Sequence, residues 1–329
     1  MNLPLDTTTT ADAADAFDRR EGLFGFFERY GLYVFCALLI GFAALVSDNF
    51  LTTRNLQDVL TQAAPLGIVV IGQSFVILVR GLDLSVASLM ATVAVVGTIF
   101  NATSDLMVPA IFAVGVGVSI VVGVVNGWLV TKRGVSPFLA TLAMMIMLQG
   151  LRFAYTHGAP SGALPHGFRV LGTGSLAGLP INLLALLFLA AIFGFVLHRS
   201  AFGRRVYMVG GNPEAARLCG INVDRVTILC YVISSVLAGI GGLFLVGYVG
   251  SIDNWVGKGY ELDSIVACVM GGVALTGGRG SLFGALIGAL ILIILFNLVL
   301  LLGFPAQWQY VVKGLIIIAA ASFYLNRGR

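Results

Sequence analysis

Histidines, cysteines and one glycine-rich stretch are the residues of this chain whose types could support catalysis, metal binding or nucleotide binding. His157, His166 and His198 have no carboxylate partner at a suitable spacing and no His-Glu-x-x-His pattern. The four cysteines include no Cys-x-x-Cys pair, which disfavours a zinc site and a disulfide framework. We therefore expect no catalytic residues, no metal site and no enzymatic activity on this chain.

The glycine-rich stretch GGVALTGGRGS, residues 271–281, superficially resembles a phosphate-binding loop. Arg279 and Gly280 stand where such a loop needs Lys followed by Ser or Thr, and the neighbouring segments are strongly apolar. Gly284 and Gly288 follow with the spacing of small residues at close helix contacts. The stretch indicates helix packing, and we expect no cofactor on this chain.

A charged loop at residues 198–225 interrupts the apolar sequence. Asn212, Pro213 and Glu214 are typical of the N-cap, N1 and N2 positions of a helix, and Gly220 is a typical stop. The pattern predicts a two-turn helix over 213–219, which is too short to be stable alone. Two interpretations remain open at this point: the helix binds a partner protein, or it packs beneath its own bundle.

Polar side chains within the apolar runs are candidates for a transport pathway. Asp83 lies at the edge of such a run, where a charge is costly unless it is paired, and Arg80 is a candidate partner. Asp83 either gates the pathway or caps the helix that follows it. The remaining candidates are amide, hydroxyl and aromatic side chains suited to a sugar, or alternatively to bonds between helices: Gln73, Asn126, Phe138, Thr141 and Asn297.

The elements that carry these residues are membrane-spanning helices. Of the 329 residues, 58% are hydrophobic and 10% are charged, far from the composition of a soluble domain, and the net charge of +4 does not indicate nucleic-acid binding. Hydropathy predicts an all-α fold with ten spans. They lie near 31–47, 57–79, 84–101, 106–130, 136–155, 180–198, 226–249, 262–275, 281–302 and 307–325.

The distribution of Lys and Arg predicts the orientation of these spans. With the N-terminus in the cytoplasm, most basic residues of the loops fall on the cytoplasmic side, as the positive-inside rule requires. Both termini are then cytoplasmic, and two five-helix halves have opposite orientations, as in an inverted repeat. Residues 1–29 are expected to be a largely disordered cytoplasmic segment, and 30–326 a permease domain that includes the cytoplasmic loop 198–225.

Several ordered motifs resemble those of one transporter family. They are GLDLS at 81–85, PFLATL at 137–142, FGRRVYMVGGNPEAARLCGI at 202–221 and ELDSIVACVMGG at 261–272. Over residues 48–325 the chain resembles the ribose-type sugar permeases of bacterial ATP-binding cassette (ABC) importers, in the branched-chain amino acid/ribose permease superfamily. The chain departs from the family at Arg80, where a Gly-Gly pair usually precedes the motif, and at Ala87, where Gly is common.

The resemblance implies a permease subunit of the bacterial inner membrane that translocates a monosaccharide, ribose or a similar small sugar. Its implied partners are a second permease subunit, with a homodimer favoured, membrane lipids, and two ATPase subunits or one duplicated ATPase that hold ATP and magnesium. A periplasmic sugar-binding protein is also implied, and the charged residues of the outer segments 156–179 and 250–261 either dock its rim or belong to solvated loops with an interfacial Trp. Related permeases carry nucleosides or autoinducer-type furanones, and the inverted halves also suit a stand-alone secondary transporter.

The resemblance also assigns a role to the loop 198–225. Its helix at 212–220 would be a coupling helix that sits in a groove of the ATPase, with Glu214 and Arg217 as a charged rim and Ala215 and Ala216 as a close-packing face. The complete set of residues implied in coupling is Gly203, Arg204, Gly210, Gly211, Asn212, Glu214, Ala215, Ala216, Arg217 and Gly220.

Overall fold

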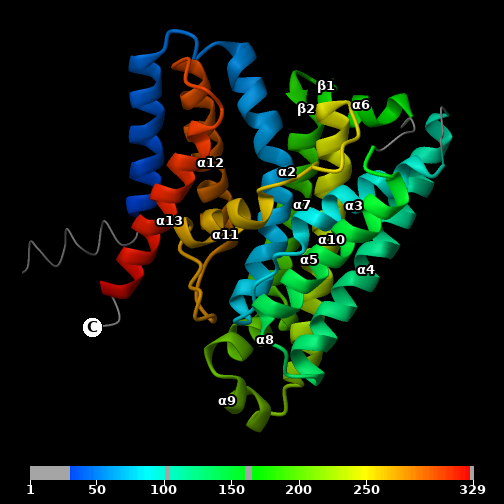
Figure 1. Cartoon of the computed structure of the whole chain (residues 1–329). Coiled ribbons are helices and arrows are strands. Elements are labelled where there is room, and N and C mark those ends of the chain that lie inside the picture. The colour runs from blue at the N-terminus through cyan, green and yellow to red at the C-terminus, as the bar shows by residue number, and fades with distance from the viewer. Residues whose placement is uncertain (1–29, 101–103, 160–164, 327–329) are drawn as a thin grey trace, which may run out of the picture.

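A computed structural model describes residues 30–100, 104–159 and 165–326 (Figure 1). Within these ranges the chain is almost entirely helical, and the only strands are β1 (Ser175–Leu176) and β2 (Leu179–Pro180), which form a small antiparallel hairpin. The predicted disordered segment 1–29 lies outside the described residues.

Each of the ten ranges expected to span the membrane contains a helix. In chain order the helices are an N-terminal helix Tyr30–Val46, α2 (Thr53–Leu78), α3 (Val86–Thr98), the 3-10 turn η1 (Asp105–Met107), α4 (Val108–Lys132), α5 (Pro137–Thr156), α6 (His166–Thr173), α7 (Ile181–Arg199), α8 (Ala201–Gly211), α9 (Pro213–Leu218), α10 (Val223–Val249), α11 (Tyr260–Met270), α12 (Leu282–Leu301) and α13 (Trp308–Asn326). Six helices of the described part are long and apolar enough to cross a membrane. An all-α, multi-pass membrane protein is therefore confirmed, while ten crossings and cytoplasmic termini stay predictions.

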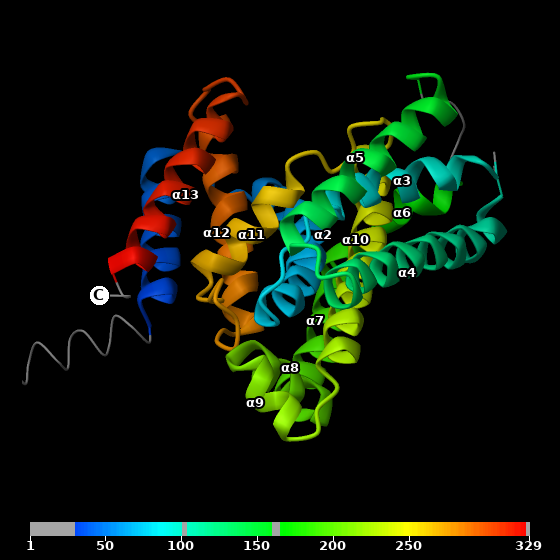
Figure 2. The same cartoon turned by 60° about the horizontal axis from the view of Figure 1, so that its bottom comes forward.

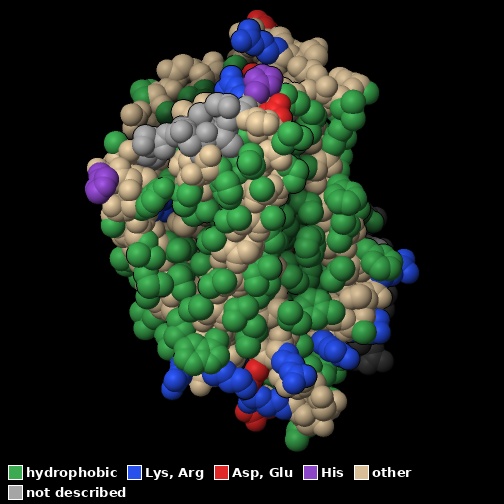
Figure 3. Space-filling model, turned by 90° about the vertical axis from the view of Figure 1, so that its right-hand side faces the viewer, with side chains coloured by type: hydrophobic (Ala, Val, Ile, Leu, Met, Phe, Trp, Pro, Cys, Tyr) green, Lys and Arg blue, Asp and Glu red, His purple; other side chains and the backbone are tan. Residues whose placement is uncertain are grey.

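Helices α2 and α10 form the centre of the bundle, and α4, α5 and α7 lie outside them (Figures 1 and 2). Nearly every residue of α2 from Ala63 to Leu78 is buried, whereas most of the side chains of α4, α5 and α7 are not. A helix that is apolar on all sides and not covered by protein is suited to contact with lipid. Figure 3 shows this as a broad hydrophobic face with Lys and Arg gathered at the lower end, where α9 lies in Figure 1.

Glycines allow the central helices to approach closely. A Cβ atom at Gly123 of α4 would lie 2.6 Å from the Cα of Val232 in α10. A Cβ atom at Gly72 of α2 would lie 2.7 Å from the Cα of Ser234, also in α10. Small residues at such crossings let backbones pack directly, which is a main source of helix association in membranes.

Two helices are shorter than their expected spans. The sequence predicts one span over 262–275, but α11 ends at Met270, and the predicted span 84–101 shortens to α3. Their 11 and 13 residues extend only about 17 and 20 Å, against a hydrocarbon core of about 30 Å. The irregular segments 79–85 and 271–281 adjoin them, and irregular backbone at membrane depth occurs where it is buried in protein or lines a cavity. The second segment meets the end of α2, since the Gly278 amide donates to the carbonyl of Leu78, the last residue of that helix, at 2.9 Å.

We predict that Gly123→Val destabilises the helix bundle. The added side chain would overlap the α10 backbone, and forced overpacking costs about 1–3 kcal/mol. Gly117→Val is the matched control, because Gly117 lies on the same helix and a Cβ atom added there would have no neighbour within 4 Å. Thermal unfolding in detergent should show a lower midpoint for Gly123→Val alone. Equal midpoints for the two variants would contradict the close packing of α4 and α10.

Candidate functional site

The segment between α7 and α10 folds into two short helices with their own caps. The Asn212 side chain accepts from the backbone amides of Glu214 and Ala215 at 3.0 and 3.1 Å, and Pro213 is the first residue of α9. Beyond the C-cap of α9, Gly220 has a left-handed φ of +77°. The predicted helix 213–219 is confirmed, with α9 ending one residue earlier at Leu218.

Helix α8 was not predicted, and Gly203, Gly210 and Gly211, which were expected only to flank the helix at 213–219, lie within α8. The Ser200 hydroxyl caps its start by accepting from the Gly203 amide at 3.1 Å. The signal that was missed is the pair Val206 and Val209, both buried and spaced as one face of a helix.

Helix α8 is also tied to the segment that precedes α12. The Tyr207 hydroxyl donates to the Gly280 carbonyl at 2.9 Å, and burial raises the pKa of this hydroxyl, so it remains a donor at ordinary pH.

Three segments meet where α8 ends, and we call this contact the joint: Leu78 at the end of α2 with Arg80 just beyond it, Gly210 and Gly211 at the end of α8, and Gly278. The Arg80 guanidinium donates to the carbonyls of Gly210, at 2.6 Å, and Gly211, at 2.5 Å. These carbonyls belong to the last turn of α8, where a cation is favoured by the helix dipole. Arg80 has a φ of +65°, a conformation that glycine adopts without strain. At this position the chain has an arginine that holds the end of α8, whereas the family that the chain resembles usually has glycine.

The expectation that Arg80 pairs with Asp83 is wrong. Asp83 is fully buried, with 0% exposure, and accepts only from neutral donors. Its carboxylate accepts hydrogen bonds from the amide and the hydroxyl of Ser85, at 3.0 and 2.6 Å, and from the hydroxyl of Ser234, at 3.0 Å. The Ser85 amide precedes α3, so Asp83 closes the turn before that helix and is not its N-cap, which is Ser85.

Three of the other predicted pathway residues converge on the same turn. The Gln73 amide bonds both backbone groups of Asp83, at 3.2 and 3.3 Å, in the amide orientation that satisfies both atoms. Asn126 donates to the Ser85 hydroxyl at 2.9 Å, and the Thr141 hydroxyl lies 3.2 Å from the Leu82 carbonyl. We call Gln73, Asp83, Ser85, Asn126 and Ser234 the Asp83 cluster, and all five are buried. The cluster is a buried hydrogen-bond network between α2, α3, α4 and α10, in which Asn126 Oδ1 is left without a partner.

Phe138 and Asn297, the other two residues of the predicted lining set, do not belong to this cluster, and a role of the set in a transport pathway stays a prediction. Phe138 lies on α5 with 48% exposure. Asn297 of α12 exchanges two hydrogen bonds with Asn55, at 2.8 and 3.2 Å. Asn55 lies about 27 Å along α2 from Gln73, at 1.5 Å per residue. Sequence reasoning missed Ser85 and Ser234, since single serines in apolar helices carry no specific signal.

The surface of α9 differs in part from its predicted arrangement. Ala216 is 2% exposed and packs into the bundle, so Ala215 is the only alanine of the expected pair on the outside. Glu214 and Arg217 are exposed, and Arg217 lies 3.7 Å from Asp224 at the start of α10. Leu218, which was not predicted, is 90% exposed. A large apolar side chain in this position offers a contact for another protein.

Of the other predicted coupling residues, Arg204, Gly211, Asn212 and Gly220 are exposed, whereas Gly203 and Gly210 are buried. A Cβ atom on Gly203 would collide with the Leu197 carbonyl, and one on Gly210 with the Leu78 carbonyl. The two buried glycines therefore allow close packing of α8 and present no side-chain surface.

The expected docking segment 156–179 packs partly on α10, the helix that leads into the other expected docking segment, 250–261. Gly172 of α6 lies against the backbone of Gly247 near the end of α10. The Lys258 ammonium lies 4.5 Å from the ring of Trp255, which is itself exposed and contacts Phe153. Docking of a partner on these segments stays a prediction.

Comparison with known proteins identifies the family. A family model described as "Branched-chain amino acid transport system / permease component" matches residues 55–321. The chain belongs to this family. The ribose import permease protein RbsC of Escherichia coli (strain K12) is 39% identical to this permease over 290 residues, covering 86% of the chain and 89% of that protein. RbsC of Bacillus subtilis (strain 168) is 36% identical over 300 residues, covering 90% and 92%.

A third relative extends over nearly the whole chain. The L-arabinose ABC transporter permease protein AraH of Azospirillum brasilense is 34% identical to this permease over 322 residues, which cover 97% of the chain and 94% of that protein. No solved structure matches the chain. The predicted membership in the sugar-permease branch of this superfamily is confirmed.

We predict that Arg80→Ala loosens α8 while the bundle stays folded. The variant loses two charge-assisted hydrogen bonds to the end of α8, each worth about 1.5–3 kcal/mol. Hydrogen exchange followed by mass spectrometry should show faster exchange in peptides covering 201–212. Arg205→Ala removes an exposed arginine from α8 itself and is the control. Unchanged exchange in Arg80→Ala would mean that the joint does not hold α8.

We predict that Asp83→Ala lowers the thermal stability of the purified permease. Three buried donors lose their acceptor, and each unpaired buried donor costs about 1–3 kcal/mol. Asp253→Ala is the matched control, because exposed Asp253 likewise accepts from a backbone amide two residues later, that of Trp255. A melting midpoint for Asp83→Ala equal to that of the control would argue against a structural role of the Asp83 cluster.

Proposed function

We propose that this chain is the transmembrane permease subunit of an ABC importer that translocates a monosaccharide, ribose or a similar small sugar, across the inner membrane. The observation that carries the proposal is the position of α9: an exposed helix at one end of the bundle that directly follows α8, whose last turn the joint connects to the end of α2. ATP hydrolysis takes place on a separate ATPase chain.

The joint supplies a mechanical link from α9 to the interior of the bundle. A force on α9 reaches α8 directly, and the Arg80 guanidinium carries it to the end of α2. The turn that follows Arg80 leads into the Asp83 cluster, which joins α2, α3, α4 and α10. Closure of an ATPase dimer would thus shift the bundle between two arrangements open to opposite sides of the membrane.

The charge distribution supports a cytoplasmic location for α9. Basic side chains gather at its end of the molecule (Figure 3): Lys132, Arg133, Arg199, Arg204, Arg205, Arg217 and Arg225. Cytoplasmic loops of inner-membrane proteins carry such an excess of Lys and Arg. The ATPase subunits, with their ATP and magnesium, then meet α9 on that side, while a periplasmic sugar-binding protein meets the opposite end.

The names of the relatives support a monosaccharide substrate. They describe permeases for ribose, L-arabinose and galactose or methyl galactoside. We propose a homodimer of the permease with two ATPase subunits, or one duplicated ATPase. Nucleosides and autoinducer-type furanones are the alternative substrates, and competition against labelled ribose uptake separates them from sugars.

We predict that Leu218→Asp prevents the chain from retaining its ATPase. The substitution places a charge on the most exposed apolar side chain of α9, where an apolar contact with a partner would be lost. Leu106→Asp is the matched control, since Leu106 is 88% exposed in η1, close to the outer end of the bundle. The tagged permease is co-expressed with the ATPase encoded beside it, purified in detergent, and the bound ATPase is quantified.

Wild type and Leu106→Asp should retain the ATPase, whereas Leu218→Asp should lose at least nine-tenths of it. Glu214→Lys, at the rim of α9, should weaken retention as well. If wild type purifies alone and still transports sugar, the importer proposal fails and secondary transport becomes the better explanation.

A further inference from the structure

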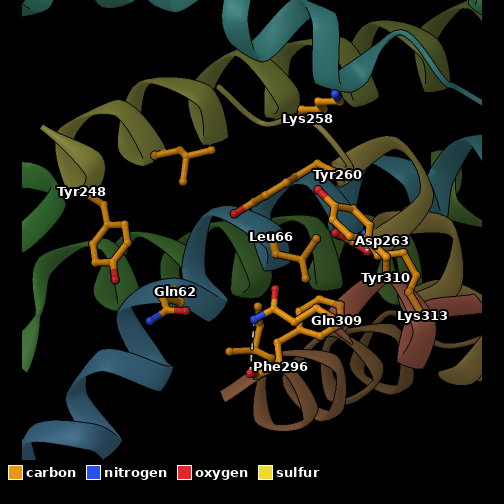
Figure 4. Close-up of a pocket in the computed structure, with 12 residues that line it drawn as sticks. Gln62, Leu66, Tyr248, Lys258, Tyr260, Asp263, Phe296, Gln309, Tyr310 and Lys313 are labelled. Carbon is orange, nitrogen blue, oxygen red and sulfur yellow. Dashed lines mark hydrogen bonds and ion pairs between the residues drawn. The ribbon is translucent and has the colours of Figure 1, made fainter. Parts of the chain in front are cut away.

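A cavity of about 240 Å³ lies between α2, α10, α11, α12 and α13, separate from the Asp83 cluster (Figure 4). Side chains from all five helices line it, and its polar lining residues include Gln62, Tyr248, Tyr260, Asp263, Gln309 and Lys313. Sequence reasoning noted Gln62 as a polar residue within a span and Asp263 within a family motif, but it did not bring these residues together, because they come from four helices far apart in the chain.

The cavity lies toward the end of the bundle opposite α9. Tyr248 is near the end of α10, a helix that begins just after α9, and Tyr260 is the first residue of α11. Gln309 is the second residue of α13. Under the proposed orientation, this is the periplasmic half of the permease. Tyr310, at the edge of the cavity, is 65% exposed, so the cavity is not sealed by protein.

A buried ion pair forms one wall of the cavity. The Lys313 ammonium lies 2.6 Å from Asp263 Oδ1, and both residues are less than 10% exposed. An ammonium has three donors and a carboxylate has two acceptor oxygens, so one contact does not use their full capacity. The pair can therefore offer both donors and acceptors to a bound molecule without adding net charge.

Aromatic rings and amides form the remaining walls. Lys313 also lies 5.6 Å from the ring of Phe296 and 5.5 Å from that of Tyr310, which places these rings beside the ion pair. Gln309 donates to the Phe296 carbonyl at 3.3 Å, which fixes its amide at the cavity wall. Figure 4 shows the Tyr260 and Tyr310 side chains close together beside Asp263, with Gln62 and Tyr248 on the far side.

The size and the chemistry of the cavity define its ligand class. Its volume equals that of about eight water molecules in the liquid, at about 30 Å³ each, which suits a molecule of roughly ten non-hydrogen atoms. Ligand sites combine apolar walls with a few polar groups that fix orientation. A molecule with hydroxyls on its edge can form hydrogen bonds with the amides and the ion pair, and C–H groups on its faces can pack against the aromatic rings.

We propose that this cavity is a binding site for a neutral monosaccharide, in which Gln62, Tyr260 and the Asp263–Lys313 pair bond its hydroxyls and Tyr310 covers one face. The inference rests on the proposed function and extends it, because it gives the permease a substrate site of its own in the half that faces the binding protein. The Asp83 cluster is not part of the proposed site, because most of its polar groups bond each other.

The test is saturation-transfer difference NMR on the purified full-length permease in nanodiscs, with D-ribose, L-arabinose and D-galactose as separate probes. The key variant is Tyr260→Phe, which removes one hydroxyl and leaves the ion pair intact. Gln62→Ala removes an amide from the opposite wall. Tyr155→Phe is the matched control, because Tyr155 is an exposed tyrosine on α5, outside the cavity. Thermal unfolding of each variant shows that it remains folded.

Wild type and Tyr155→Phe should give a signal with at least one of the sugars. Tyr260→Phe and Gln62→Ala should each weaken its affinity about threefold to tenfold, as expected for the loss of one hydrogen bond. No signal from wild type with any probe, or equal signals from folded cavity variants and wild type, would overturn the site. Either result leaves the ATPase experiment unaffected, so failure of the site and failure of the importer proposal are distinguishable.

Discussion

Buried irregular backbone between α2 and α3 is the constraint on which the rest of this structure depends. Residues 79–85 leave helical geometry inside an apolar bundle, where each unsatisfied amide or carbonyl costs several kcal/mol. Specific partners bond the polar groups at and around this turn. The Gly278 amide donates to the carbonyl of Leu78 at the end of α2, the Gln73 side-chain amide bonds both backbone groups of Asp83, and the Asp83 carboxylate accepts from the Ser85 amide.

The same turn explains how a peripheral helix is joined to the centre of the bundle. Arg80 starts the turn, and its guanidinium reaches the last carbonyls of α8. Since the backbone beyond Arg80 is held by a network across α2, α3, α4 and α10, a displacement of α8 cannot remain local. Packed interfaces of this kind change between discrete arrangements and do not deform continuously. An element with this connectivity is well suited to transmit work from outside the membrane.

Two polar regions within the bundle have opposite characters. In the Asp83 cluster the polar groups mostly bond each other, and the five side chains are fully enclosed. In the cavity beside α13, the Asp263–Lys313 pair retains spare bonding capacity next to open volume. The first arrangement stabilises a fold, and the second is suited to a ligand. A permease with both holds its helices together without closing the space that a substrate needs.

Local patterns in the sequence determined the helices of the ten apolar ranges, the composition of the membrane-facing surface and the capped helix α9, because hydropathy and capping depend on residues a few positions apart. The family motifs in the sequence predicted the family to which the chain belongs. Tertiary structure alone decided that Arg80 anchors α8 instead of pairing with Asp83, that Ala216 faces inward, and that Asn297 pairs with Asn55. It also brought Asp263 and Lys313 together across 50 positions of sequence. Such partners depend on how helices cross, and spacing along the chain does not specify a crossing.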